Sequence, residues 1–96
     1  MKKQEVIDTI LQLEEKYFDL VWYARKSPEH FDIPKVKENM DRIDNLYPTE
    51  VEGLYGEHSD WNHGFNSGML AGLRYVIALY ESGKERADDE FPFLDT

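Results

Sequence analysis

The sequence predicts an all-α fold, a small helical bundle in which two long antiparallel helices are joined through a shorter helix. Residues 3–26 contain neither Gly nor Pro, which favours one long helix. Apolar residues recur there, at 36–47 and at 61–80, with the three- and four-residue spacing of a helix face. Three of the four prolines fall between these stretches. With 96 residues the chain holds a single domain, 1–84, followed by an acidic tail, 85–96.

The first helix is expected over residues 3–26. It carries one apolar row with a 4-3-4-3-4 spacing and a second row about 100° around the helix, so nearly half of its circumference is apolar. Ser27-Pro28 ends this helix, because the residue before a proline avoids the α region, and the same pair can start a short turn. The first row is Val6, Ile10, Leu13, Tyr17, Leu20 and Ala24, and the second is Ile7, Leu11, Phe18 and Trp22.

A shorter helix of about three turns is expected to end before Pro48. Thr49 and Glu52 have the T-x-x-E spacing of a capping box, which predicts one or two further turns. Ser59 or Asp60 is expected to cap the helix that follows. The apolar face of the shorter helix consists of Val36, Met40, Ile43 and Tyr47.

The last helix, from residue 61 to 82, differs in composition from the rest of the chain. From Trp61 to Tyr80 there is no acidic residue and one formal charge, Arg74, although 32% of the chain is charged. Polar residues interrupt it before the ~20 apolar residues of a membrane span, so a buried helix is expected. Bulky residues form one broad face. A second face consists of the small residues Gly64, Gly68, Ala71 and Gly72, with Tyr75 among them.

The face of small residues predicts a homo-oligomer. A glycine inside a helix costs roughly 1 kcal/mol relative to alanine, and the close approach of another backbone would offset that cost. One short helix can hardly cover a helix that is apolar on two faces, so part of this surface is expected between subunits, most simply in a symmetric dimer or a ring. The alternative is that segments 28–33 and 49–56 fold over the same face.

Composition excludes several classes of function. The chain has 11 Lys and Arg against 20 Asp and Glu, a net charge of −9, which argues against direct binding to nucleic acid. It has no cysteine, which excludes disulfides, thiol nucleophiles and Cys-ligated metals. The first ten residues lack the apolar run of a signal peptide, and no membrane span is expected, so a cytoplasmic location is predicted.

No pattern predicts a catalytic residue, a cofactor or a metal site. The spacing of His58 and His63 does not place two imidazoles on one helix face. Glu14 and Glu15 match the start of the E-E-x-x-E magnesium motif of MazG-type nucleotide pyrophosphatases. Because Phe18 stands where that motif needs its next carboxylate, a solvated acidic face is expected instead.

Two groups of residues are candidates for contact with a ligand or partner. If the last helix packs against a symmetry mate, its polar and aromatic residues could line a pocket for a small nucleotide-like molecule, although interface packing explains them as well. Apolar residues of the tail could dock on this chain or a neighbouring subunit, or insert into a partner's pocket. The candidates are Trp61, His63, Asn66 and Arg74 in the helix, with Tyr75 beside them, and Phe91, Phe93 and Leu94 in the tail.

The run D-W-N-H-G-F-N-S-G-M-L-A-G-L-R-Y-V at residues 60–76 and the ending E-F-P-F-L-D-T resemble small proteins of tailed phages that infect marine cyanobacteria. The likeness extends over most of the chain, including residues 16–22. It implies the cytoplasm of an infected cell as the setting and brings no activity with it. In size and helical style alone, the chain is also similar to all-α phage proteins that sequester cyclic-nucleotide immune signals as oligomers.

Together these features predict a non-enzymatic phage accessory protein that acts by binding a host protein. An acidic surface and an apolar tail suit a basic partner, because charge steers the encounter. The alternative is an oligomer that sequesters a small nucleotide-like ligand, against which the shortage of basic residues counts.

Overall fold

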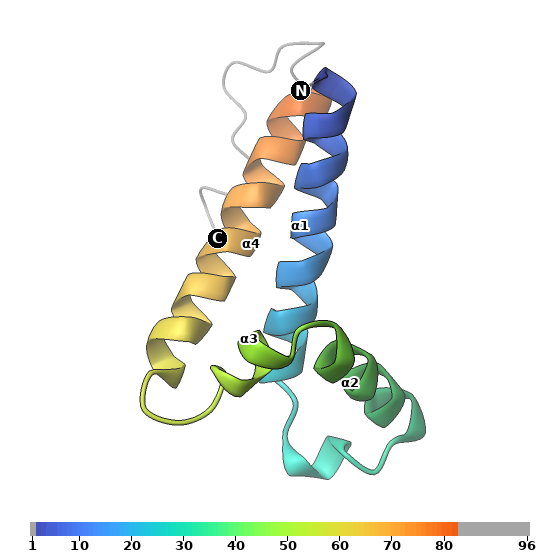
Figure 1. Ribbon diagram of the computed structural model, residues 1–96, viewed down its shortest axis with the longest axis vertical. Helices are drawn as coiled ribbons and strands as arrows, with labels where there is room; N and C mark the ends of the chain where they lie inside the picture. The colour runs from blue at the N-terminus through green and yellow to red at the C-terminus, as the bar shows by residue number, and fades with distance from the viewer. Residues whose placement is uncertain (1, 83–96) are drawn as a thin grey trace.

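The computed structural model describes residues 2–82, and all regular structure in that part of the chain is helical (Figure 1). The all-α prediction is therefore confirmed. The two long helices run antiparallel and side by side, and the shorter elements gather where the first one ends (Figure 1). The elements are α1 (Lys3–Ala24), a 3-10 turn η1 (Pro28–His30), α2 (Pro34–Leu46), α3 (Pro48–Glu52) and α4 (Ser59–Ser82).

The tail at residues 85–96 lies outside the described residues. The predictions for Phe91, Phe93 and Leu94, and the tail's separation from the domain at 1–84, therefore stay predictions.

The Ser27-Pro28 pair ends α1 as expected. The helix stops at Ala24, and the backbone N–H of Ser27 donates to Nδ1 of His30 at 3.2 Å. Pro28 is the first residue of η1, a position at which a backbone N–H would have no partner within the helix, so the missing N–H of proline costs nothing. The chain thus changes direction and enters α2 within ten residues of the end of α1.

The capping predictions for the later helices are wrong. Thr49 lies inside α3, which begins at Pro48 with Tyr47 as its N-cap residue and no side-chain cap. A proline at the first helical position has a φ suited to the helix and no N–H to cap, so the helix starts ahead of the threonine. Ser59 and Asp60 likewise lie within the first turn of α4.

The core sits where α2 and α3 meet the second half of α1. Leu20 and Ile43 are fully buried, and Leu54, just after α3, is 2% exposed. Tyr23 packs beside them, and its hydroxyl donates to Oδ1 of Asp44 at 2.8 Å. Burial, followed by this hydrogen bond, raises the pKa of Tyr23 well above its usual value. The first half of α1 lies outside this core and packs along α4 (Figure 1).

An ion pair ties α3 to α1. Nζ of Lys16 lies 2.7 Å from Oε2 of Glu50, and both side chains are partly exposed. The hydrogen bond from Lys16 lowers the pKa of Glu50, and the same contact raises the pKa of Lys16. Glu50 therefore adds stability above its unfolded pKa and loses that contribution as the pH falls through its lowered folded pKa. Lys16 adds stability below its ordinary pKa and loses it as the pH rises through the raised value.

Glu50→Gln is expected to lower the free energy of unfolding by about 0.5 kcal/mol at pH 7, since pairs this exposed are screened by water. At pH 3 the loss should be smaller than at pH 7, because a falling pH protonates the wild-type carboxylate, although the lowered pKa of Glu50 delays this. Urea unfolding at both pH values measures this loss of free energy. Glu52→Gln is the control, because Glu52 is an exposed residue of the same helix. An equal loss at pH 3 and pH 7 would contradict the ion-pair explanation.

Candidate functional site

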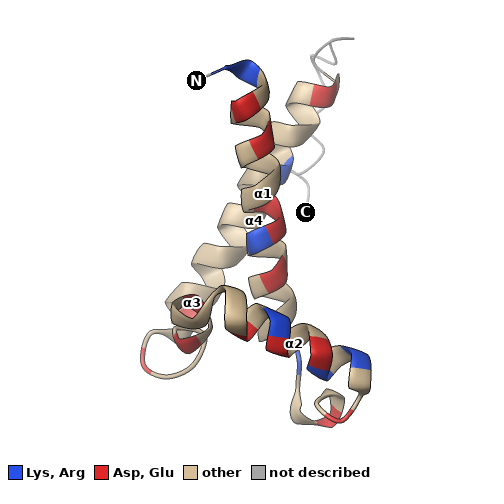
Figure 2. Cartoon of the chain, turned by 45° about the vertical axis from the view of Figure 1, so that its right-hand side comes forward, with Lys and Arg blue, Asp and Glu red and all other residues tan. Residues whose placement is uncertain are grey.

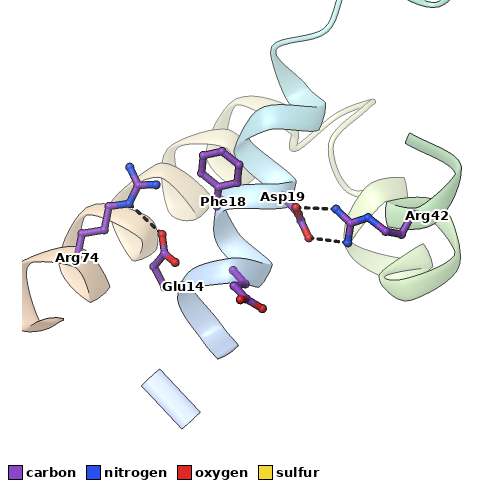
Figure 3. Close-up of a pocket in the computed structure, with 6 residues that line it drawn as sticks. Glu14, Phe18, Asp19, Arg42 and Arg74 are labelled. Atoms are coloured by element: carbon purple, nitrogen blue, oxygen red, sulfur yellow. Dashed lines mark hydrogen bonds and ion pairs between the residues drawn. The ribbon is translucent and has the colours of Figure 1, made fainter. Parts of the chain in front are cut away.

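An open pocket of about 390 Å³ lies where α1, α2 and α4 approach one another (Figure 3). Two arginines reach toward α1 from opposite sides, one from α2 and one from α4 (Figure 3). The exposed ring of Phe18 lies between them. The residues that line the pocket are Glu14, Glu15, Phe18 and Asp19 from α1, Arg42 from α2 and Arg74 from α4.

Both arginines of this pocket are paired. Arg42 holds the carboxylate of Asp19 with two nitrogens, at 2.9 and 3.2 Å, and this hydrogen bonding raises the pKa of Arg42. Nε of Arg74 donates to Oε2 of Glu14 at 3.0 Å, and its guanidinium carbon lies 5.4 Å from the centre of the Phe18 ring. These contacts link α2 and α4 to α1, so the arrangement has a structural role without any ligand.

The pairing of Glu14 corrects one prediction. The sequence placed Glu14 and Glu15 on a solvated acidic face, but Glu14 is only 21% exposed in its side chain and bonds Arg74, sixty residues away. The sequence did hold a signal, because Arg74 is the single formal charge between residues 61 and 80 and a half-buried arginine needs a carboxylate. Within residues 2–82, no group of three or more His, Asp or Glu side chains could hold a metal ion.

Of the residues expected to line a nucleotide pocket, His63 and Asn66 border one small pocket of about 140 Å³ against α1, whereas Trp61 and Arg74 do not line it. The ring of Trp61 stacks on Phe65, with ring centres 5.2 Å apart. Nε2 of His63 lies 2.9 Å from the carbonyl oxygen of Leu54, so the ring ties α4 to the preceding loop. Asn66 is buried at 7% exposure against the second half of α1.

Helical geometry separates Trp61 from Arg74. Thirteen residues place them about 140° apart around α4 and about 20 Å apart along it. The Arg74 guanidinium is held by Glu14 and Phe18, whereas Trp61 is 67% exposed on another side. One small ligand cannot contact both residues of the same chain.

A second candidate surface runs along the part of α4 that α1 leaves uncovered, and Phe65 and Val76 lie at its edge next to α1. No described helix covers this part of α4 (Figure 1). A Cβ built on Gly64, Gly68 or Gly72 would meet no atom of the described residues within 4 Å. The bulky side chains of this surface are well exposed, with Phe65 at 44% and Val76 at 43%. We call this surface the open face; it consists of Trp61, Gly64, Phe65, Gly68, Ala71, Gly72 and Val76.

The exposure of the open face overturns one expectation and leaves another untested. Among the described residues, the buried members of α4 are Asn66 and Leu70, because α1 is the long helix packed beside it. The expected burial of the remaining apolar surface between subunits stays a prediction. The alternative in which segments 28–33 and 49–56 cover the glycines is wrong, since neither reaches them. Tyr75, the remaining member of the predicted interface, is half-buried.

The open face carries no charged side chain, whereas Lys, Arg, Asp and Glu are frequent along α1 and α2 (Figure 2). None of the helices between residues 2 and 82 is long and apolar enough to cross a membrane.

No protein-family model, curated protein or solved structure matches the chain. The candidate surfaces are accordingly judged on their geometry alone.

Proposed function

We propose that this chain acts by binding another protein through the open face of α4, and that it is not an enzyme. The observation that carries the proposal is an exposed apolar helix face, free of charge over about four turns, in a chain of which 32% is charged. Contiguous exposed apolar surface on a small protein is typical of an interaction site. Removing it from water costs little, because it holds no charge to desolvate.

The aromatic end of the open face has the features of a binding anchor. Trp61 and Phe65 stack with nearly parallel rings, 12° apart, and Phe65 meets the edge of Tyr17 on α1 at 6.2 Å. The rings are therefore already ordered, which reduces the side-chain entropy lost on binding. Trp is also among the residues that contribute most to protein interfaces.

The glycines of the open face suit a helical partner. Gly64, Gly68 and Gly72 expose backbone without side chains along one line of α4, so a second helix can approach more closely than usual. Such closeness increases dispersion contacts between the two backbones. Those contacts would compensate for the loss of helix stability that three glycines cause.

The acidic surface and the setting complete the proposal. A net charge of −9 steers a basic host protein toward the chain, and carboxylates are frequent along α1 and α2 but absent from α4 between Trp61 and Tyr80 (Figure 2). The resemblance to cyanophage proteins supports an accessory role in the cytoplasm of an infected cell. Since Trp61 and Arg74 lie far apart, we do not extend the proposal to a nucleotide ligand.

Benzoylphenylalanine in place of Phe65 is expected to form photo-crosslinks to protein in cells that express the full chain. The same substitution at Phe31 is the control, because Phe31 has a similar exposure, 40% against 44%, and lies outside the open face. Denaturing gels and mass spectrometry of the adducts measure the outcome. Equal crosslinking at the two positions, or no protein adduct at Phe65, would refute the proposed function.

A further inference from the structure

We infer that the open face of α4 is covered by α4 of a second copy of this chain. The two helices pack antiparallel about a two-fold axis that lies midway between Gly68 and Gly72 along the helix. This inference rests on the proposed function and names a second copy, in place of a host protein, as the partner at the open face. It follows from three properties of the open face: its charge, the distribution of large and small residues along it, and the register in which two copies fit.

Charge limits where two copies can meet. Each chain carries a net charge of −9, so most pairs of surfaces would bring carboxylates together at a cost in free energy. From Trp61 to Tyr80 there is no acidic residue, and Arg74, the one cation there, is paired with Glu14 on another side of α4. The open face is therefore a surface on which two acidic copies can pack without like charges in contact.

The shape of the open face fits two crossing helices. Its glycine pair, Gly68 and Gly72, lies near the middle of α4, and bulky residues lie toward both ends, Trp61 and Phe65 on one side and Val76 on the other. Two helices that cross at an angle come closest at the crossing point and diverge from it. Small residues at the centre and large ones beyond it match that geometry.

An antiparallel register makes the face complementary to itself. A two-fold axis midway between Gly68 and Gly72 along the helix places Gly68 opposite Gly72 of the partner subunit, so the backbones meet at the point of closest approach. The same axis brings Gly64 level with Val76 of the partner subunit, a small residue beside a large one. Each of these contacts occurs twice, as two-fold symmetry requires.

The available surface extends beyond one helix. At 24 residues, α4 is about 36 Å long and about 10 Å wide, a projected area of about 360 Å². A standard interface buries about 800 Å² on each partner, so flanking surface must contribute. Val76 also borders an apolar groove of about 190 Å³ between α1 and α4, lined by Ile7 and Leu11 among others. The apolar surface therefore continues from the open face onto α1.

Light scattering during size-exclusion chromatography of the full chain tests the inference. The wild type is expected to be a dimer at about 100 µM, a concentration at which a micromolar interface is occupied. Gly68→Leu is expected to abolish the dimer. Ser67→Leu is the matched control, since Ser67 is also exposed, adjoins Gly68 in sequence and faces another side of α4, and it should remain dimeric. Circular dichroism should show unchanged helix content in both variants.

Engineered disulfides test the register, because the chain has no cysteine of its own. Gly64→Cys and Val76→Cys should form a disulfide when the two variants are mixed and oxidised. Neither should do so alone, since equivalent positions lie about 18 Å apart along an antiparallel pair. Strong disulfides within either variant alone would overturn the antiparallel arrangement.

The outcomes separate this inference from the proposed function. A monomeric wild type, or a dimer that Gly68→Leu leaves intact, overturns the second copy as the occupant. If Phe65 then still crosslinks to a different protein, binding through the open face stands. If a dimer forms but Phe65 gives no adduct, the association uses another surface, and both the inference and the proposed function are wrong.

Discussion

Replacing Gly64, Gly68 and Gly72 together by alanine is expected to stabilise the folded monomer by about 3 kcal/mol and to weaken its association. Each glycine costs a helix interior about 1 kcal/mol relative to alanine. Nothing between residues 2 and 82 opposes the change, because a Cβ at any of the three positions meets no atom of that part of the chain within 4 Å. In the proposed dimer, the same methyl groups would hold the two backbones apart.

Urea unfolding at a protein concentration where the monomer dominates measures the first effect, and light scattering at high concentration measures the second. Gly56→Ala is the control, because Gly56 has a φ of +94°, a conformation that alanine adopts only with strain. That variant should lose stability while the triple variant gains it. A triple variant that is less stable as a monomer would mean that the glycines pack inside the protomer.

The helices could be predicted because their signals are local. The 4-3-4-3-4 row of α1 and the Ser27-Pro28 stop depend on neighbouring residues, and the structure reproduces both. The starts of α3 and α4 were misplaced, because α3 begins at Pro48 without a side-chain cap and α4 already begins at Ser59, one of the two residues expected to cap it. Helix starts depend on backbone conformation as much as on the identity of the capping residue.

The surroundings of the candidate site were harder to predict, because they depend on residues far apart in the sequence. Glu14 and Arg74 meet only because α1 and α4 run antiparallel. The face of small residues was visible from helical spacing alone, but whether the connecting segments covered it depended on where α3 docks. That position follows from the burial of Leu54 and the contact of Asn62 with Gly53 at 2.7 Å, neither of which has a sequence signal.

Leu20→Ala is expected to lower the free energy of unfolding by 2–5 kcal/mol, the range found when a buried leucine is removed from a packed core. Leu20 is fully buried, with 0% of its surface exposed to solvent, and it lies where α1, α2 and α3 converge. The residues around it cannot easily close the cavity, because Ile43 and Leu54 are themselves buried on neighbouring elements. The loss is large for a domain of this size, whose total stability is about 5–15 kcal/mol.

Leu46→Ala provides the comparison, because Leu46 is 54% exposed at the end of α2 and should change stability by less than about 0.5 kcal/mol. Thermal unfolding followed by circular dichroism measures both. If the two variants lost the same stability, the core would not lie at the junction of α1, α2 and α3. Because Leu20 is remote from the open face, a dimer that persists in Leu20→Ala would also show that α1 and α4 stay paired when this junction is weakened. The pair of α1 and α4 would then bind independently of the core that positions α2 and α3.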